Sequence, residues 1–197
     1  MFNDNRITVA KAIKPDPGFS NLQTIDDSII VDLKYATTDN FTGQVIYDFQ
    51  TAVARTGTAK KLGIAAQLLR AQGYRIKIWD AYRPTVAQKK LFTVCPDPMW
   101  VAPPNPNYSH EKGVTFDLTL TDLDGNELAM QSGFDDFSDR AKRSYQRTAE
   151  QDRYYRLLLD VMTKADFHGY ENEWWDYQDN DADAYGPKQV DPNDYRL

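Results

Sequence analysis

Apolar and polar residues alternate along this chain with two periods, one typical of helices and one typical of strands. Apolar residues three to four positions apart predict an amphipathic helix, whereas strict alternation predicts a half-buried strand. Helical spacing covers 58–72 and 148–164, and strand-like patterns cover 28–35, 74–79, 114–120 and the aromatic-rich 171–177. Pro84 fits the first turn of a further helix over about 85–94. Thr58 is the predicted N-cap of the first helix, and Gly73 is its predicted end.

Turn-forming residues separate these segments. Asp124-Gly125 predicts a hairpin whose second strand is 127–130. Five prolines within 95–108 predict an ordered loop or lid. Because nothing resembles a linker, we expect a single domain over 1–197, with an N-terminal extension at 1–20 and a polar tail or covering loop at 178–197.

Composition excludes several classes of protein. A net charge of −6 and the lack of Lys/Arg-rich runs argue against a nucleic-acid surface. No apolar run approaches the roughly 20 residues that span a bilayer, and the N-terminus lacks the apolar core of a signal peptide. The single cysteine, Cys95, excludes an internal disulfide framework. We therefore expect a soluble, cytoplasmic protein without nucleic-acid or membrane partners; its oligomeric state is not predicted.

The most informative stretch is 109–120, which contains His110 and Asp117 seven residues apart with Gly113 between them. Residues seven apart on one strand would face opposite sides, so we expect His110 in a turn and Asp117 on the following strand. Gly113 allows the chain to bend between them. This geometry could bring both side chains to one metal ion, although a loop histidine beside a surface aspartate remains the simpler alternative.

Two further positions could serve either a site or the core. Arg83 follows a predicted strand and precedes Pro84, so it is held at a rigid strand-to-helix corner. It could act on a ligand or could pair with Asp80 for structural reasons. Tyr35, at the end of the first predicted strand, could line a site or be a core tyrosine.

Five pieces of the chain, in order over about residues 28–177, together resemble the D-alanyl-D-alanine dipeptidases. This group of zinc peptidases is related to DD-carboxypeptidases and to the hedgehog signalling domain. The pieces are Tyr35-Ala-Thr-Thr-Asp-Asn-Phe-Thr-Gly43, Trp79-Asp-Ala-Tyr-Arg-Pro84, Ser109-His110-(x)6-Asp117-Leu-Thr-Leu, Gly133-Phe-Asp135 and Glu173-Trp-Trp175. Each is a weak signal alone, whereas five in the family's order are a strong one.

The resemblance implies a role for each matching residue. His110 and Asp117 would bind zinc, and Glu173 would be the general base. Arg83 would stabilise the transition state, Asp135 would hold the substrate ammonium, and Tyr35, Ser109 and Tyr108 would line the substrate pocket. An aspartate at one end of a small cavity would select dipeptides, because a longer peptide has no ammonium at that position.

The chain departs from the family at the third zinc ligand. The family has a histidine directly after Glu-Trp-Trp, whereas this chain has Asp176. The only other histidine, His168, could approach the site if 166–170 and 173–177 formed a hairpin, but we expect it to be a surface or structural residue. A His-Asp-Asp set is harder than the family's, so it should bind zinc less tightly relative to manganese or magnesium. Asp176 could belong to a natural working variant, an impaired relative or an engineered protein.

Tyr108 is the second departure, because many relatives have a small serine two residues before the zinc histidine. Its bulk could narrow the pocket or change the preferred dipeptide.

We predict an α+β domain with a central, mainly antiparallel sheet flanked by helices and a metal on one face of the sheet. The predicted activity is hydrolysis of D-alanyl-D-alanine or a similar D,D-dipeptide, with one Zn2+ or another divalent ion such as Mn2+ at His110, Asp117 and Asp176. Two alternatives remain at this point. One is a binding or regulatory module without turnover, and the other is a carboxypeptidase that acts on peptidoglycan stems, against which Asp135 argues.

Overall fold

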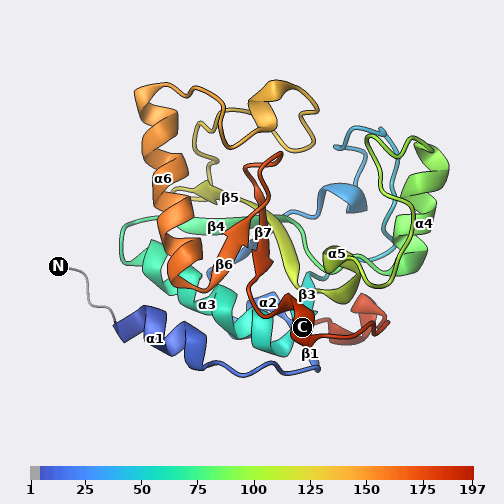
Figure 1. Cartoon of the computed structure of the whole chain (residues 1–197), viewed down its shortest axis with the longest axis horizontal. Coiled ribbons are helices and arrows are strands. Elements are labelled where there is room, and N and C mark those ends of the chain that lie inside the picture. The colour runs from blue at the N-terminus through green and yellow to red at the C-terminus, as the bar shows by residue number, and fades with distance from the viewer. Residues whose placement is uncertain (1–4) are drawn as a thin grey trace.

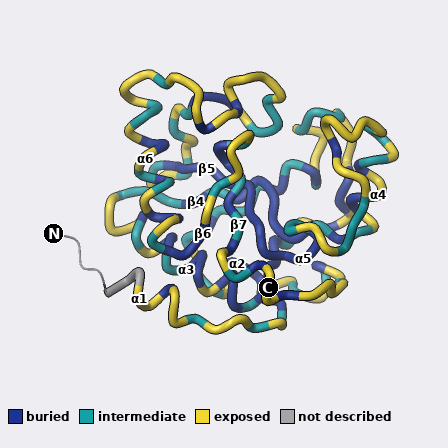
Figure 2. Tube along the Cα trace, in the orientation of Figure 1, coloured by how far each residue is buried: buried dark blue, intermediate teal, exposed yellow. Residues whose placement is uncertain are grey.

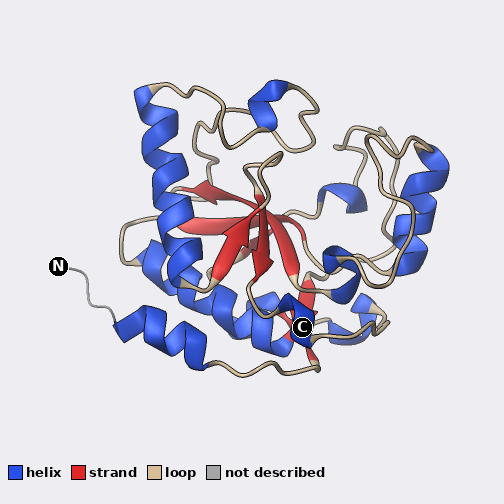
Figure 3. Ribbon diagram, viewed as in Figure 1, coloured by secondary structure: helices blue, strands red, loops and turns tan. Residues whose placement is uncertain are grey.

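The computed structural model describes residues 5–197, and a five-stranded sheet lies at its centre (Figures 1 and 3). The strand order is β2-β4-β5-β7-β6, with bounds Ile30–Val31, Arg75–Asp80, Thr115–Thr121, Asp176–Asp179 and Phe167–Gly169. β2 is parallel to β4, and the other three pairs are antiparallel. The predicted α+β class with a mainly antiparallel sheet is therefore confirmed.

Two long helices, α3 (Thr56–Arg70) and α6 (Ala149–Lys164), contact each other and pack on one face of this sheet. Lys61 of α3 reaches Asp179 of β7, with 2.6 Å between Nζ and Oδ1. Side chains alternate between the two faces along a strand, so Asp176, three residues earlier, lies on the opposite face. The face away from α3 and α6 is therefore the one available for a site.

The predicted helices are present with small shifts. α4 (Thr85–Val94) has the predicted bounds, and α6 begins after Thr148, whose side chain forms a capping box with Gln151. The predicted N-cap Thr58 is wrong, because α3 begins two residues earlier. Thr58 is instead a buried helical residue whose hydroxyl donates to Asp179 at 2.5 Å.

The strands predicted over 74–79 and 114–120 agree with β4 and β5, whereas the other predicted strands are too long. The strand expected over 28–35 contains only β2, and a 3-10 turn at Lys34–Ala36 follows it. The strand expected over 127–130 is reduced to one bridge between Thr121 and Glu127. The segment 171–177 is mostly a turn, and β7 starts only at Asp176. The first two segments pair with one neighbour at most, whereas β7 pairs with both β5 and β6 and is short because the residues before it form a turn.

The two ends of the chain cover the same side of the molecule. The N-terminal segment contains α1 (Asn5–Ala12) and β1 (Phe19–Asn21), which pairs with β3 (Val53–Arg55) before α2 (Leu22–Ile25) begins. The C-terminal segment contains short 3-10 turns at Ala182–Ala184 and Pro192–Tyr195, and its end lies near β1 and β3 in Figure 1. Arg55 donates to the carbonyl of Gly186 at 2.6 Å. This segment therefore covers the domain and is not a free tail.

Figure 2 shows that the buried backbone lies along the sheet and on the sides of the helices that face it, whereas the loops are largely exposed. Residues of every strand in the five-stranded sheet contribute to or pack against one continuous hydrophobic core. Among the described residues, no helix combines the length and the apolar character needed to cross a membrane.

Candidate metal and catalytic site

The imidazole of His110 is presented by a one-turn helix, α5 (Ser109–Lys112), directly before β5. The helix ends at Gly113, which has a φ of 77° and so lies in the left-handed region that favours glycine. His110 therefore lies in a short helix and not in the simple turn that was predicted. Its Nδ1 is 2.9 Å from the carbonyl oxygen of Ala81 and donates to it, so Nε2 is free to bind a metal.

Two aspartates from neighbouring strands face this nitrogen. Asp117 of β5 is directly opposite Asp176 of β7 in the antiparallel register, so both carboxylates lie on the same face. His110 Nε2 lies 3.4 Å from Asp117 Oδ2 and 3.6 Å from Asp176 Oδ2. The structure thus brings together the three residues that the sequence suggested as metal ligands.

These residues fit a divalent cation. Asp117 Oδ1 is buried and has no hydrogen-bond partner among the described residues. Ligand atoms of Asp117, Glu173 and Asp176 lie within 4.8 Å of one another. Asp117 is buried and the other two are half-buried, and carboxylates at such distances repel each other unless protons or a cation compensate them. One imidazole nitrogen and two carboxylates are a donor set that zinc accepts and that manganese also suits.

Glu173 lies in the turn between β6 and β7, three residues before Asp176. Burial, and then the charges of Asp117 and Asp176, raise the pKa of Glu173 to about 8. Burial lowers the pKa of His110, but the Asp117 carboxylate opposes this effect, and the pKa of the imidazole ends well above its usual value. Bound protons therefore offset the negative charge of the carboxylates when no cation does so.

The Arg83 guanidinium lies beside the cluster, and both of its predicted roles are compatible with its contacts. Its Nε and Nη2 donate to Asp80 Oδ2 at 2.9 and 2.5 Å, as the structural alternative predicted. The same Nη2 is 3.9 Å from Asp117 Oδ2, which places it at the edge of the candidate metal site. Sequence reasoning missed two more of its partners, Tyr47 and Gln88, which lie 3.2 and 2.8 Å away.

Asp135 and Tyr35 form a second polar group on the same side of the molecule. The Tyr35 hydroxyl donates to Asp135 Oδ2 at 2.8 Å, and the Arg83 guanidinium lies over the Tyr35 ring. Asp135 has a φ of 51°, which a non-glycine residue adopts rarely. Burial, with a contribution from Asp117, raises its pKa to about 7. An ammonium group would be a suitable partner for this carboxyl, because it would restore the ionised form.

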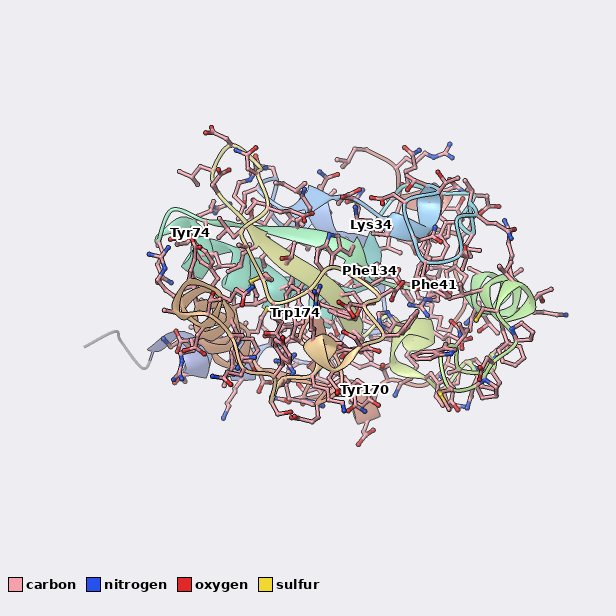
Figure 4. The ribbon with its side chains drawn as sticks, turned by 90° about the horizontal axis from the view of Figure 1, so that it is seen from above. Lys34, Phe41, Tyr74, Phe134, Tyr170 and Trp174 are labelled. Carbon is pink, nitrogen blue, oxygen red and sulfur yellow. The ribbon has the colours of Figure 1, made fainter. Side chains whose placement is uncertain are left out.

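Aromatic rings pack around both groups. Phe134 contacts Tyr35, Trp79 and Trp175, with ring centroids 5.6 to 6.0 Å apart. Trp174 packs edge-on against Trp79, and Figure 4 shows both Phe134 and Trp174 among the crowded side chains near the sheet. These rings restrict water and fix the segments that carry Asp135 and Glu173.

An open pocket of about 330 Å3 lies beside the candidate metal ligands. Ser109, Glu173 and Asp176 are among its lining residues, as is His168. The His168 side chain is exposed, and its Nδ1 is 2.7 Å from Asn180 Oδ1. It does not join the candidate ligand cluster, in agreement with the expected surface role. Tyr108 precedes α5, is 46% exposed and does not line this pocket.

Known proteins that are similar to this chain are D-alanyl-D-alanine dipeptidases. The sequence model described as D-ala-D-ala dipeptidase matches residues 16–192. A D-alanyl-D-alanine dipeptidase of Escherichia coli (strain K12) is 34% identical over 166 residues, which cover 84% of this chain and 86% of the relative. One of Enterococcus faecium is 31% identical over 188 residues, covering 81% and 90%.

A solved structure of the vancomycin-resistance D,D-pentapeptidase VanY in complex with Zn(II) is also similar. It matches 70% of this chain and 80% of its own, with a TM-score of 0.44 and 15% identity. This likeness is too distant to support an argument about the site.

Proposed function

The chain belongs to the D-ala-D-ala dipeptidase family and is a metallopeptidase, and from this premise we propose which of its residues hydrolyse D-alanyl-D-alanine or a similar D,D-dipeptide. The observation that carries the proposal is the convergence of His110, Asp117 and Asp176 beside Glu173. These four groups come from α5, β5, β7 and the turn before β7, and their functional atoms lie on one face of the sheet.

We propose that His110, Asp117 and Asp176 hold one divalent cation, either zinc or a harder ion such as manganese. When bound, such an ion polarises the scissile carbonyl, acidifies water and favours the ionised form of Glu173. Asp176 stands at the position of the family's histidine, directly opposite Asp117 in the register, and its Oδ2 lies 3.6 Å from His110 Nε2.

Glu173 acts as the general base. Its carboxyl oxygen lies within 4.8 Å of ligand oxygens of Asp117 and Asp176, which is close enough to accept a proton from a water molecule between them. The same carboxyl then returns that proton to the leaving amine. Arg83, whose Nη2 lies 3.9 Å from Asp117, donates to the oxygen on which negative charge develops.

Asp135 selects the substrate by binding its ammonium group. The carboxyl is half-buried and accepts a hydrogen bond from Tyr35, and burial raises its pKa to about 7, so a positive charge beside it would favour its ionised form. A dipeptide supplies the missing positive charge, whereas an internal residue of a longer peptide supplies only a neutral amide. This preference favours a dipeptidase over a carboxypeptidase that acts on peptidoglycan stems. The single cysteine is compatible with a cytoplasmic location, which we also propose.

The experiment is an assay for free D-alanine with purified protein, D-alanyl-D-alanine and either Zn2+ or Mn2+. Turnover that a chelator abolishes and that either ion restores supports the proposal. Glu173→Gln is the matched control, because it keeps the shape of the side chain and removes the base. Dipeptide binding without turnover at any divalent metal would refute hydrolysis and favour a binding module. Release of D-alanine from a stem pentapeptide but not from the dipeptide would favour a carboxypeptidase.

A further inference from the structure

The turn that carries Glu173 and Asp176 is weakly held by its own backbone. The three hydrogen bonds that join Tyr170, Glu173 and Asp176 to each other have N–O distances of 3.3 to 3.4 Å, at the long end of the normal range. A turn of this kind would not by itself fix a base and a metal ligand at the accuracy that catalysis needs.

A buried guanidinium, that of Arg143, occupies the inside of this turn. Its Nε donates to the carbonyl of Tyr170 at 2.8 Å, and its Nη2 donates to the carbonyls of Trp174 and Asp176 at 3.0 and 2.7 Å. These contacts are shorter than the hydrogen bonds within the turn. Tyr170 and Trp174, two of the three residues it binds, are labelled in Figure 4.

The surroundings of Arg143 indicate a specific function for its charge. The residue is 9% exposed, and its guanidinium stacks over the Tyr177 ring at 4.4 Å. Among the described residues, no carboxylate forms an ion pair with it. Burying a guanidinium without a counter-ion is costly, and bonds to several carbonyl oxygens offset that cost only in a fixed geometry.

The chain leaves space for this side chain at one position in particular. A Cβ atom on Gly169 of β6 would overlap the Arg143 guanidinium. Gly169 does not have a positive φ, so backbone conformation does not require a glycine there. The absence of a side chain at 169 is therefore explained by the position of Arg143.

We propose that Arg143 is a positioning residue that holds the turn 170–176 and thereby sets Glu173 and Asp176 against His110 and Asp117. It touches neither substrate nor metal and acts through the carbonyls on either side of Glu173. The inference rests on the proposed roles of Glu173 and Asp176. Sequence reasoning offered no signal for it, because Arg143 lies in an irregular loop and not in a periodic element.

The test compares Arg143→Gln and Arg143→Lys with a matched control, Arg147→Gln. Arg147 is also a largely buried arginine that stacks on an aromatic ring, Tyr155, but it donates to Gln131 and to the carbonyl of Arg143 and not to the turn. Gly169→Ala adds a fourth variant that displaces the guanidinium without removing it.

Three measurements are made on each protein: amide hydrogen exchange at 171–176 in the metal-free form, Zn2+ and Mn2+ affinity by chelator competition, and kcat and KM with the dipeptide. Loss of an outer partner of a metal ligand typically costs about 10- to 100-fold in affinity or activity. We expect losses of that size in metal affinity and kcat for Arg143→Gln, faster exchange in the turn, and a nearly unchanged KM. Arg143→Lys should restore only part of the loss, because an ammonium cannot bind three carbonyls as a planar fork does.

Unchanged exchange and metal affinity in a folded Arg143→Gln protein would overturn the proposal. The proposal would also be overturned if Arg147→Gln had the same melting temperature as Arg143→Gln and lost as much metal affinity and kcat. Such losses would reflect general destabilisation. If Arg143→Gln does not fold, Arg143→Lys and Gly169→Ala decide the question by the same criteria. Should the wild type not hydrolyse the dipeptide, the exchange measurement still tests Arg143 separately from the proposed function.

Discussion

Replacing Asp135 by asparagine should stabilise the metal-free protein at alkaline pH while it removes activity. Burial raises the pKa of Asp135 from 3.8 to about 7. A shift of about three pKa units at about 1.4 kcal/mol each corresponds to about 4 kcal/mol, the free energy lost when this carboxyl ionises in the fold. Asparagine keeps an oxygen that can accept from the Tyr35 hydroxyl and carries no charge, so Asp135→Asn should recover about 2–4 kcal/mol.

The direction in which stability changes with pH follows from how many protons the folded and the unfolded protein bind. Between pH 3.8 and about 7 the folded protein holds a proton on Asp135 that the unfolded chain has released. The stability of the wild type therefore falls as the pH rises through this window, and the full loss is present above pH 7. At pH 5 the loss is only about 1.5 kcal/mol, so the stability difference between variant and wild type should shrink by about 2.5 kcal/mol between pH 8 and pH 5.

The assay is urea unfolding of both proteins with a chelator present, at pH 5 and at pH 8, together with dipeptide kinetics on the metal-loaded forms. Asp139→Asn is the matched control, because this exposed aspartate lies a few residues away and pairs only with Lys142 on the surface. Its removal should not stabilise the fold. Equal stability of Asp135→Asn and wild type at pH 8, or a difference that does not change with pH, would refute the reasoning. An unchanged KM would refute the role of Asp135 in binding the ammonium.

Three other changes test the proposed roles. Glu173→Gln should lower kcat by about 10²- to 10⁴-fold and leave the metal content intact by elemental analysis; metal loss would make Glu173 a ligand instead. Arg83→Lys should lower kcat by about 10²-fold with a smaller change in KM in steady-state kinetics, and a change in KM alone would mean that Arg83 only binds the ground state. Asp176→His should raise zinc affinity relative to manganese in chelator competition, because imidazole is the softer ligand. An unchanged ratio would show that residue 176 does not bind the metal.

The parts of the site that the sequence predicted are those encoded locally. His110, Gly113 and Asp117 lie within eight residues, and the alternation of β5 together with one glycine limits the arrangements they can adopt. Arg83 was placed correctly at a strand-to-helix corner because Pro84 directly precedes α4. The apolar stripe of α6 likewise predicted that helix almost to the residue.

The parts that the sequence did not predict depend on contacts between distant segments. The meeting of Asp117 and Asp176 was expected only from the family resemblance, because it is a matter of strand register, which no local pattern in 171–177 specifies. Tyr47 joins the site from an irregular loop, where its hydroxyl donates to Asp80 at 2.7 Å. The segments 28–35 and 127–130 have strand-like composition, but only Ile30–Val31 and Glu127 pair with a neighbouring strand. Without a neighbouring strand, composition alone does not make a strand.

The balance of charges among these distant segments indicates what the site requires. Five carboxyl groups lie close enough to perturb one another, with one guanidinium and one imidazole among them: Asp80, Asp117, Asp135, Glu173 and Asp176, with Arg83 and His110. Burial, and then neighbouring carboxylates, raise the pKa values of Asp135 and Glu173 to about 7 and about 8, so an added positive charge would favour the ionised form of each. One lies beside the candidate metal ligands, and the other faces the place proposed for the substrate ammonium. Because a metal ion and a dipeptide together supply that charge, each should release protons as it binds, and the uptake of either should weaken as the pH falls.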